Sequence, residues 1–277
     1  MKHTIQSVFS AFLLWLPLSA QNLTIPHVVD GGGWQSTFVL TNTSANPASA
    51  TLIFHQQTTD NGETQPWNPT ILQVVSTSGM TLAGSSTLFL TTSGTAATTT
   101  QGWAELNADP GVVGYVVFND RLPGHDDQEG TAPTVTSANR LMVPYDDSNG
   151  FVTGIAIVNP TGSPQDISVG FRTTTGLVAT GTLPTLPAGG HTAFVLSQQF
   201  PVIKDHVGLA EFYSATGTLS MIALRFTPDH SFTSAPVYFQ SGAPMITAAP
   251  SNPSDPPNPY DPGTPVYIYR AKPGVGH

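Results

Sequence analysis

The densest group of side chains able to do chemistry is the run Gly-His-Asp-Asp-Gln-Glu-Gly at residues 124–130. Its carboxylates, on Asp126, Asp127 and Glu129, offer the oxygen ligands that calcium takes in proteins. The run lacks the alternating ligand spacing of an EF-hand loop. We therefore interpret it as a solvated loop, with a calcium site at these three residues as the alternative.

Two glutamates, Glu105 and Glu211, each lie within an otherwise apolar stretch and could form a catalytic pair. Glycosidases use two such carboxylates, one on each side of the bond that is cleaved. These two residues hold equivalent positions in a repeat described below, which favours a structural role, such as accepting backbone N–H bonds at a strand edge. A secreted hydrolase with a site between the two repeats is kept as an alternative function.

The other residue types that support catalysis or metal binding form no recognisable pattern. The chain has no Cys, so disulfides, thiolate metal sites and cysteine nucleophiles are absent. It contains no Gly-x-Ser-x-Gly, His-Glu-x-x-His, P-loop or dinucleotide-binding motif. We interpret the scattered histidines as ordinary surface or turn residues, and we expect no catalytic residue and no cofactor other than calcium. These histidines are His27, His55, His125, His191, His206 and His230.

Tryptophan supplies the best candidate for binding a ligand. An indole ring suits stacking on a neutral sugar, because it presents a rigid apolar face with a polar N–H at its edge. Trp34 and Trp103 are replaced by Phe151 and Leu209 at equivalent places of the repeat, which indicates core positions where only bulk matters. Trp67 lies in a segment without a counterpart. We therefore expect it to be the ligand-binding residue, the alternative being a ring that only pins its own loop.

The sequence segments that must position these residues occur twice in the chain. Residues 33–42 align without gaps on residues 150–159, and Gly-Trp-Ala-Glu-Leu at 102–106 aligns on Gly-Leu-Ala-Glu-Phe at 208–212. An ordered series of such matches is the mark of an internal duplication. The first copy carries an extra stretch at about residues 58–78, which we expect to be a longer hairpin or a surface loop.

Within each copy the apolar residues recur with period two. Phe38 and Leu40 alternate with polar or smaller residues, as do Leu52 and Phe54, and turns rich in Gly, Pro and Asn separate these runs. A period of two indicates strands with one face on a core. Short strands with regular turns predict an all-β fold, built of two tandem β-sandwich (Ig-like) modules.

The two ends of the chain differ from the modules in composition. Residues 1–20 begin with a basic Lys2, continue with an apolar run and end in small residues, which predicts a signal peptide and therefore an exported protein. After Tyr238 the chain becomes rich in proline. We interpret the run 266–270 as a frayed terminus or, alternatively, as a strand that docks on a module edge or on another chain. The expected domains are residues 1–20, signal peptide; 21–138, module 1; 139–239, module 2; and 240–277, tail.

Charge limits the partners that this chain can recognise. Its net charge is -9 with only eight Lys and Arg, which disfavours nucleic acids and anionic membranes because both require clustered cations. Charged residues make up 9% of the chain against about 25% in ordinary proteins. A neutral polysaccharide or another cell-surface protein fits this composition better, and self-association is a further possibility.

The motifs at the start and end of each copy resemble a known group of sequences. These motifs are Gly-Gly-Gly-Trp at 31–34, Phe-Val-Leu-Thr-Asn at 38–42, the run at 150–160 and Gly-His-Thr-Ala-Phe-Val-Leu at 190–196. Over about residues 25–238 the chain resembles uncharacterised secreted bacterial proteins with tandem β-sandwich repeats. The resemblance implies an exported or cell-surface β protein and carries no activity. We therefore expect a non-enzymatic structural, adhesive or polymer-binding protein, the alternatives being the hydrolase above and a self-assembling surface subunit.

Overall fold

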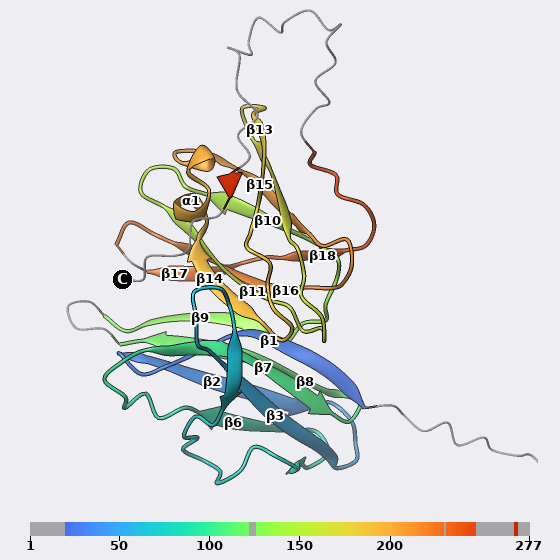
Figure 1. Cartoon of the computed structure of the whole chain (residues 1–277). Helices are drawn as coiled ribbons and strands as arrows, with labels where there is room; N and C mark the ends of the chain where they lie inside the picture. The colour runs from blue at the N-terminus through green and yellow to red at the C-terminus, as the bar shows by residue number, and fades with distance from the viewer. Residues whose placement is uncertain (1–19, 122–125, 230, 248–268, 271–277) are drawn as a thin grey trace, which may run out of the picture.

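The computed structural model describes residues 20–121, 126–229, 231–247 and 269–270, and almost all of its regular structure is β-strand (Figure 1). The strands form four sheets, and all but one of their pairings are antiparallel. The expectation of an all-β fold is confirmed. Nearly all of the expected signal peptide and most of the expected tail lie outside the described residues.

The first half of the chain forms two sheets, one in the order β1-β7-β3-β4, with β5 also paired to β3, and one in the order β6-β2-β8-β9. Period-two alternation of buried and exposed residues is clearest in β3, as the sequence predicts. The strands are β1 (Gln21–Asp30), β2 (Trp34–Asn42), β3 (Ala48–Gln57), β4 (Thr64–Trp67), β5 (Met80–Leu82), β6 (Ser86–Thr91), β7 (Thr100–Ala108), β8 (Val112–Asp120) and β9 (Gln128–Pro133).

The second half also forms two sheets, in the orders β18-β10-β15-β12-β13-β19 and β14-β11-β16-β17. A single turn of α-helix, α1 (Leu196–Gln199), and a 3-10 turn (Pro201–Ile203) follow β14. The strands are β10 (Arg140–Asp146), β11 (Val152–Val158), β12 (Ser168–Thr173), β13 (Val178–Thr182), β14 (His191–Val195), β15 (Val207–Tyr213), β16 (Ser220–Phe226), β17 (Phe232–Ala235), β18 (Tyr238–Gln240) and β19 (Tyr269–Arg270).

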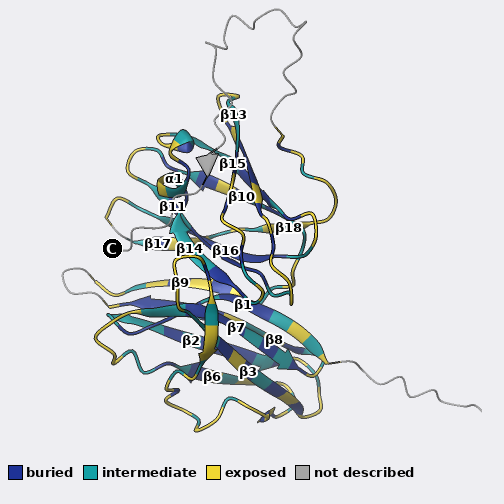
Figure 2. Ribbon diagram, viewed as in Figure 1, coloured by how far each residue is buried: buried dark blue, intermediate teal, exposed yellow. Residues whose placement is uncertain are grey.

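The two halves share one arrangement of strands. The order β10-β15-β12-β13 reproduces β1-β7-β3-β4, and β14-β11-β16-β17 reproduces β6-β2-β8-β9. The segments that align in the sequence, 33–42 with 150–159, lie on β2 and β11, the second strands of matching sheets. Each half has its own hydrophobic cluster between its two sheets, containing Phe38 and Phe54 in one half and Ile157 and Phe171 in the other. Figure 2 shows buried residues as dark blue bands along the strands of both halves.

A buried asparagine closes the same turn in both halves. Asn42 and Asn159 are both fully buried. Each donates its side-chain N–H groups to three backbone carbonyls and accepts bonds from the backbone N–H and the hydroxyl of the residue two positions on, Ser44 or Thr161. Because a buried amide must find such partners, this side chain fixes the geometry of the loop in each half.

The halves pack against each other over the outer face of the sheet β14-β11-β16-β17. Ala156, Ile222, Leu224 and Phe232 lie on that sheet yet belong to the hydrophobic cluster of the first half. Strand β17 lies beside β9, as Figure 1 shows. The hydrophobic cluster of the first half therefore extends across the boundary, and the two halves are packed together.

The segment after β18 continues across the second half. Asn139, Arg140 and Glu211 hold residues 242–246 by hydrogen bonds to backbone groups, and Ile246 is buried. Further on, β19 pairs in parallel with β13. Residues 240–247, which begin the expected tail, thus pack on the second half.

Candidate functional site

Trp67 lines an open groove of about 800 Å³ at the edge of the first half. Strand β3 pairs with β4 at Phe54 and with β5 at Ala50, and the chain leaves the sheet between these two partners. The exposed residue Ile53 therefore forms part of the groove floor. The segment 68–78, which belongs to the stretch without a counterpart in the second copy, forms the opposite wall.

Hydrogen bonds hold the wall of the groove in place on both sides. Toward β3, the Thr77 hydroxyl and carbonyl bond to Leu52, and the Gly79 N–H donates to the Thr51 hydroxyl. Toward β6, the Leu72 N–H donates to the Thr91 carbonyl. The inserted segment is thus a longer hairpin, β3–β4, followed by an anchored loop, and the groove is a built feature of the fold.

The groove presents polar and apolar groups but no charge. None of its lining residues is charged, and they combine an indole, an amide and several hydroxyls with apolar side chains. The Trp67 ring packs edge-on against Phe54 with the ring centroids 6.2 Å apart, and the residue remains partly exposed. Its position therefore agrees with both sequence interpretations, a contact residue and a ring that pins its own loop. The polar members are Thr51, Asn68, Thr70, Ser76, Thr77 and Ser78.

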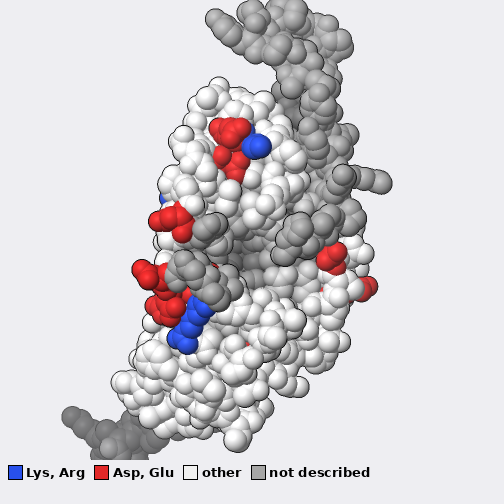
Figure 3. Space-filling view, turned by 90° about the vertical axis from the view of Figure 1, so that its left-hand side faces the viewer, with Lys and Arg blue, Asp and Glu red and all other residues white. Residues whose placement is uncertain are grey.

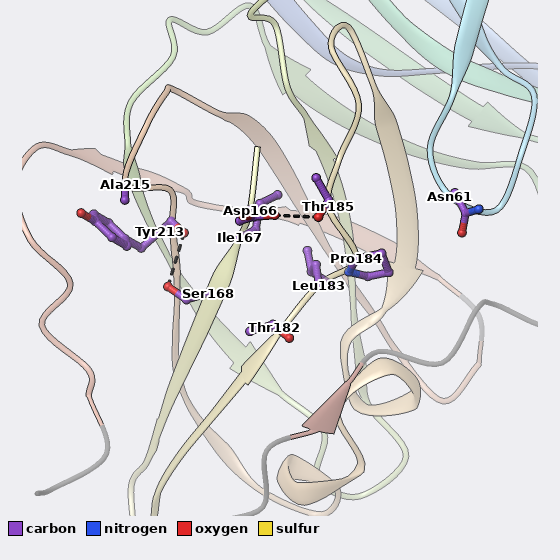
Figure 4. Close-up of a pocket in the computed structure, with 10 residues that line it drawn as sticks. All are labelled: Asn61, Asp166, Ile167, Ser168, Thr182, Leu183, Pro184, Thr185, Tyr213 and Ala215. Atoms are coloured by element: carbon purple, nitrogen blue, oxygen red, sulfur yellow. Dashed lines mark hydrogen bonds between the residues drawn. The ribbon is translucent and has the colours of Figure 1, made fainter. Parts of the chain in front are cut away.

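A second groove of about 700 Å³ lies where the halves meet (Figure 4). Asn61, at the tip of the β3–β4 hairpin, contributes from the first half, and the other lining residues come from the second half. Its one carboxylate, Asp166, accepts a hydrogen bond of 2.6 Å from the Thr185 hydroxyl. A single carboxylate already bonded to a neighbour does not provide the acid and base pair that hydrolysis of a glycosidic bond requires.

The acidic loop has other partners in the part that the structure describes. Asp127 forms an ion pair with Arg121 at 3.3 Å, and Glu129 accepts a hydrogen bond from the Asn119 amide. Among the described residues no group of three or more His, Asp or Glu side chains is arranged to hold a metal ion. Because residues 122–125 lie outside the described ranges, a calcium site that uses Asp126, Asp127 and Glu129 stays a prediction.

The two equivalent glutamates have different partners. Glu105 is partly exposed on β7 and contacts His55 at 3.0 Å. Glu211 is fully buried on β15, where it accepts the backbone N–H groups of Met245 and Ile246. The expected role of accepting backbone hydrogen bonds therefore applies to Glu211 alone, and each glutamate has partners within its own half.

Two histidines far apart in the sequence meet at the boundary between the halves. His27 Nδ1 lies 3.2 Å from His191 Nε2, and the rings are stacked with their centroids 5.4 Å apart. His191 Nδ1 lies 2.8 Å from Gln57 Oε1. An amide oxygen only accepts, so His191 donates from Nδ1 and, when neutral, accepts from His27 at Nε2. The interpretation of these histidines as ordinary surface or turn residues is wrong, because residues from both halves surround them.

A bulge in β1 aims His27 at this boundary. The pairing of β1 with β7 shifts between Ile25 and Val28, where Pro26 has no N–H to donate. Burial lowers the pKa of His27 from 6.5 to about 4. Burial and the neighbouring His27 also lower the pKa of His191 well below its ordinary value. A proline inside the strand is the only sequence signal that points to this arrangement.

Two tryptophans of the first half also contact the second half. The indole N–H of the buried Trp103 donates to the Gly189 carbonyl at 2.9 Å, and the ring stacks on His55. Trp34 packs against Phe232 with the ring centroids 5.8 Å apart. These residues do more than fill a core, since each contacts the other half. Their counterparts in the second half therefore need not be tryptophan.

The face of the molecule drawn in Figure 3 carries few charges. Figure 3 shows small groups of acidic and basic side chains separated by wide uncharged areas. In the described part of the chain, no helix is long and apolar enough to cross a membrane. No protein-family model matches the sequence, and none of the curated proteins is significantly similar to it.

Proposed function

We propose that the chain is a pair of Ig-like β-sandwich modules, derived by duplication of one module and exported by a bacterial cell, that binds a neutral polysaccharide without catalysing a reaction. The repeated strand order and the equivalent networks of Asn42 and Asn159 support the duplication. The sequence of residues 1–20 supports export.

The observation that carries the binding function is the composition of the groove beside Trp67. A ligand there meets one indole ring, an exposed amide and several hydroxyls, and no formal charge. Aromatic faces stack on the apolar faces of sugar rings, while hydroxyls and amides replace the hydrogen bonds that sugars make with water. A neutral glycan satisfies both features, whereas an anionic or cationic polymer would find no counter-charge in the groove.

The alternative hydrolase has weaker support. The Trp67 groove contains no carboxylate and the second groove contains one, Asp166. Glu105 and Glu211, the two carboxylates at equivalent positions, have separate partners in separate halves. The geometry therefore favours binding without hydrolysis.

The test is the mobility of the protein in native gels that contain soluble neutral polysaccharides, such as a mixed-linkage glucan, a xylan or a mannan. The wild type is expected to be retarded by at least one of them. Trp67→Ala is expected to reduce its apparent affinity about tenfold, the cost of losing an aromatic contact of about 1.4 kcal/mol.

Two further variants keep the result interpretable if Trp67→Ala also weakens packing against Phe54. Asn68→Ala removes an exposed amide of the groove and leaves the core unchanged, so it is expected to weaken retardation at an unchanged melting temperature. Tyr238→Ala removes an exposed aromatic ring outside the groove, on β18, and is expected to behave as wild type. Absence of retardation by any neutral polysaccharide would contradict the proposal.

A further inference from the structure

The outer face of the sheet β6-β2-β8-β9 carries a row of large side chains that lie outside the hydrophobic core. The strand register places Phe89, Val39, Tyr115 and Pro133 side by side across the four strands. Phe89 is 55% exposed and Tyr115 is 40% exposed, whereas Val39 between them is only 4% exposed. Val39 is not part of the core cluster, so the neighbouring side chains on this face cover it.

Pairs of threonines lie on both sides of this row. The hydroxyls of Thr37 and Thr91 are 3.0 Å apart, as are those of Thr41 and Thr87. Within each pair one hydroxyl donates to the other, so the second keeps a proton and both keep lone pairs for a ligand. Residues two positions apart along a strand are roughly 7 Å apart, so each pair borders the aromatic row.

The spacing and charge of the face select the kind of ligand. Phe89 and Tyr115 are two strands apart, which is roughly 10 Å at the usual strand separation. That distance is close to the disaccharide repeat of an extended β-1,4-linked glycan, so alternate sugar rings could lie over the two aromatic residues. No charged residue lies in the aromatic row or in the threonine pairs, and Glu129, toward the end of the same face, accepts a hydrogen bond from Asn119.

We propose that this face is a second binding surface, which receives the flat side of an extended, insoluble neutral polysaccharide. The proposal deepens the function proposed above and rests on it. The groove beside Trp67 is concave and suits a single soluble chain, whereas the sheet face is an open surface that suits chains packed side by side.

The sheet edges distinguish this ligand from an added protein strand. At the β6 edge, the Leu72 N–H and the Thr70 carbonyl bond to the chain at Thr91 and Ser93. At the β9 edge, Thr131 lies next to Ser234 of β17. Both edges are therefore partly covered, whereas the face between them is open. The face also carries two pairs of hydroxyls beside its aromatic rings, whereas the centre of a typical interface between protein copies is more apolar.

The experiment is a pull-down on insoluble cellulose and chitin, combined with the native gels in soluble polysaccharide described above. Wild type is compared with the double variant Phe89→Ala and Tyr115→Ala, with Trp67→Ala, and with Tyr238→Ala as a control of matched exposure (51%). The double variant is expected to be retained about tenfold less on the insoluble polymer, with wild-type retardation in the soluble gel. Because the two rings flank and cover Val39, a modest decrease in melting temperature is expected, and retention is compared at a temperature at which both proteins are folded.

Each other outcome has a defined meaning. If the double variant is retained as well as wild type, the face is not a binding surface, and the groove proposal is judged by Trp67→Ala alone. If Trp67→Ala has no effect and the double variant loses retention, the result supports the sheet face as a binding surface and contradicts the groove as one. If wild type forms dimers in size-exclusion chromatography that the double variant lacks, the face is an interface between copies and the proposal is overturned. Retention of wild type by neither polymer overturns it as well.

Discussion

At the scale of single residues, the stacked histidines show how the protein depends on neutral side chains at the boundary between its halves. Gln57 accepts from His191, and His191 accepts from His27, so one proton on each ring satisfies the chain of bonds. The side-chain oxygen of Gln57, Oε1, also accepts a hydrogen bond from the Gln101 amide, which supports its role as the acceptor for His191. An additional proton on either ring would place a charge in a desolvated site beside a second imidazole.

This arrangement predicts a loss of stability in acid. The pKa of His27 is about 4 in the folded chain and 6.5 ordinarily, so protons favour the unfolded state between these values. The contribution of neutral His27 to the free energy of unfolding is therefore fully present above about pH 6.5. It decreases as the pH falls toward 4, by up to about 3 kcal/mol. Urea unfolding at pH 7 and pH 4.5 measures the difference.

Replacing the titrating ring isolates its contribution. His27→Gln is expected to be less stable than wild type at pH 7 and to lose less stability between pH 7 and pH 4.5. His206→Gln, a histidine outside the stacked pair, is expected to keep the wild-type dependence. Equal pH dependence in His27→Gln and wild type would mean that another group causes the acid effect.

At the scale of elements, the β3–β4 hairpin ties the first half to the second. The Gly62 carbonyl accepts the backbone N–H of His191, and the Thr64 hydroxyl donates to the Gly189 carbonyl. Gly62 has a φ of 83°, and a Cβ added there would lie 2.5 Å from a Leu186 methyl carbon and 2.9 Å from the His191 carbonyl oxygen. The hairpin tip thus approaches the other half too closely for any side chain.

Two glycine substitutions separate this close approach from backbone strain. Gly62→Ala and Gly79→Ala both place alanine at a positive φ, but a Cβ at Gly79 meets open space. Each is expected to lose about 1 kcal/mol from the backbone, and Gly62→Ala about 1–3 kcal/mol more because the packing at the boundary must shift. Equal urea midpoints for the two variants would show that the hairpin tip does not stabilise the boundary.

The elements themselves could be predicted, and their contacts with the other half could not. Period-two alternation around Phe38 and Leu52 indicated strands because one face of each sheet is buried, and the repeat indicated that the strands occur in two sets. The contact of His27 with His191 joins residues separated by 164 positions, and no local pattern encodes such a pairing. The helix α1 is a single turn, too short to establish a helical period.

The candidate sites were likewise predictable only where a local sequence feature marks them. Trp67 could be selected because it lacks a counterpart in the second copy, and it does line a groove. The surface around Phe89 and Tyr115 was missed, because it depends on the register between β6, β2 and β8. The comparison with Leu209 predicts a core position for Trp103, but it cannot reveal that Trp103 contacts Gly189 of the other half.

At the scale of the whole molecule, the segment 241–247 completes the second half. Asn139 and Arg140 bond to the Gly242 and Ala243 carbonyls, and the buried Glu211 accepts two backbone N–H groups of the same segment. Gly170 lies beneath it, where a Cβ would come within 2.4 Å of the Ile246 carbonyl oxygen. A carboxylate that is fully buried needs these donors, since its ion pair with Arg140 is long at 3.6 Å.

These contacts predict that two truncations of the C-terminal region differ in effect. A chain that ends at Thr247 keeps every bond to Glu211 and is expected to melt within about 2 °C of the full chain. A chain that ends at Gln240 removes both donors and uncovers the sheet, so it is expected to be less stable by about 2–4 kcal/mol. Calorimetry measures both differences, and equal melting temperatures would show that the segment is not part of the folded unit.

Comparison of the full chain with the chain ending at Thr247 tests whether the region after Thr247 joins copies of the protein. Strand β19 pairs with β13 of its own chain, with Tyr269 opposite Gly181 and Arg270 opposite Thr182. A strand that occupies an edge within its own chain cannot add to the same edge of another. The full chain and the chain ending at Thr247 are therefore expected to elute as the same oligomeric state in size-exclusion chromatography with light scattering. A larger species that disappears on truncation would instead identify residues 248–277 as an assembly segment and favour a self-assembling surface subunit.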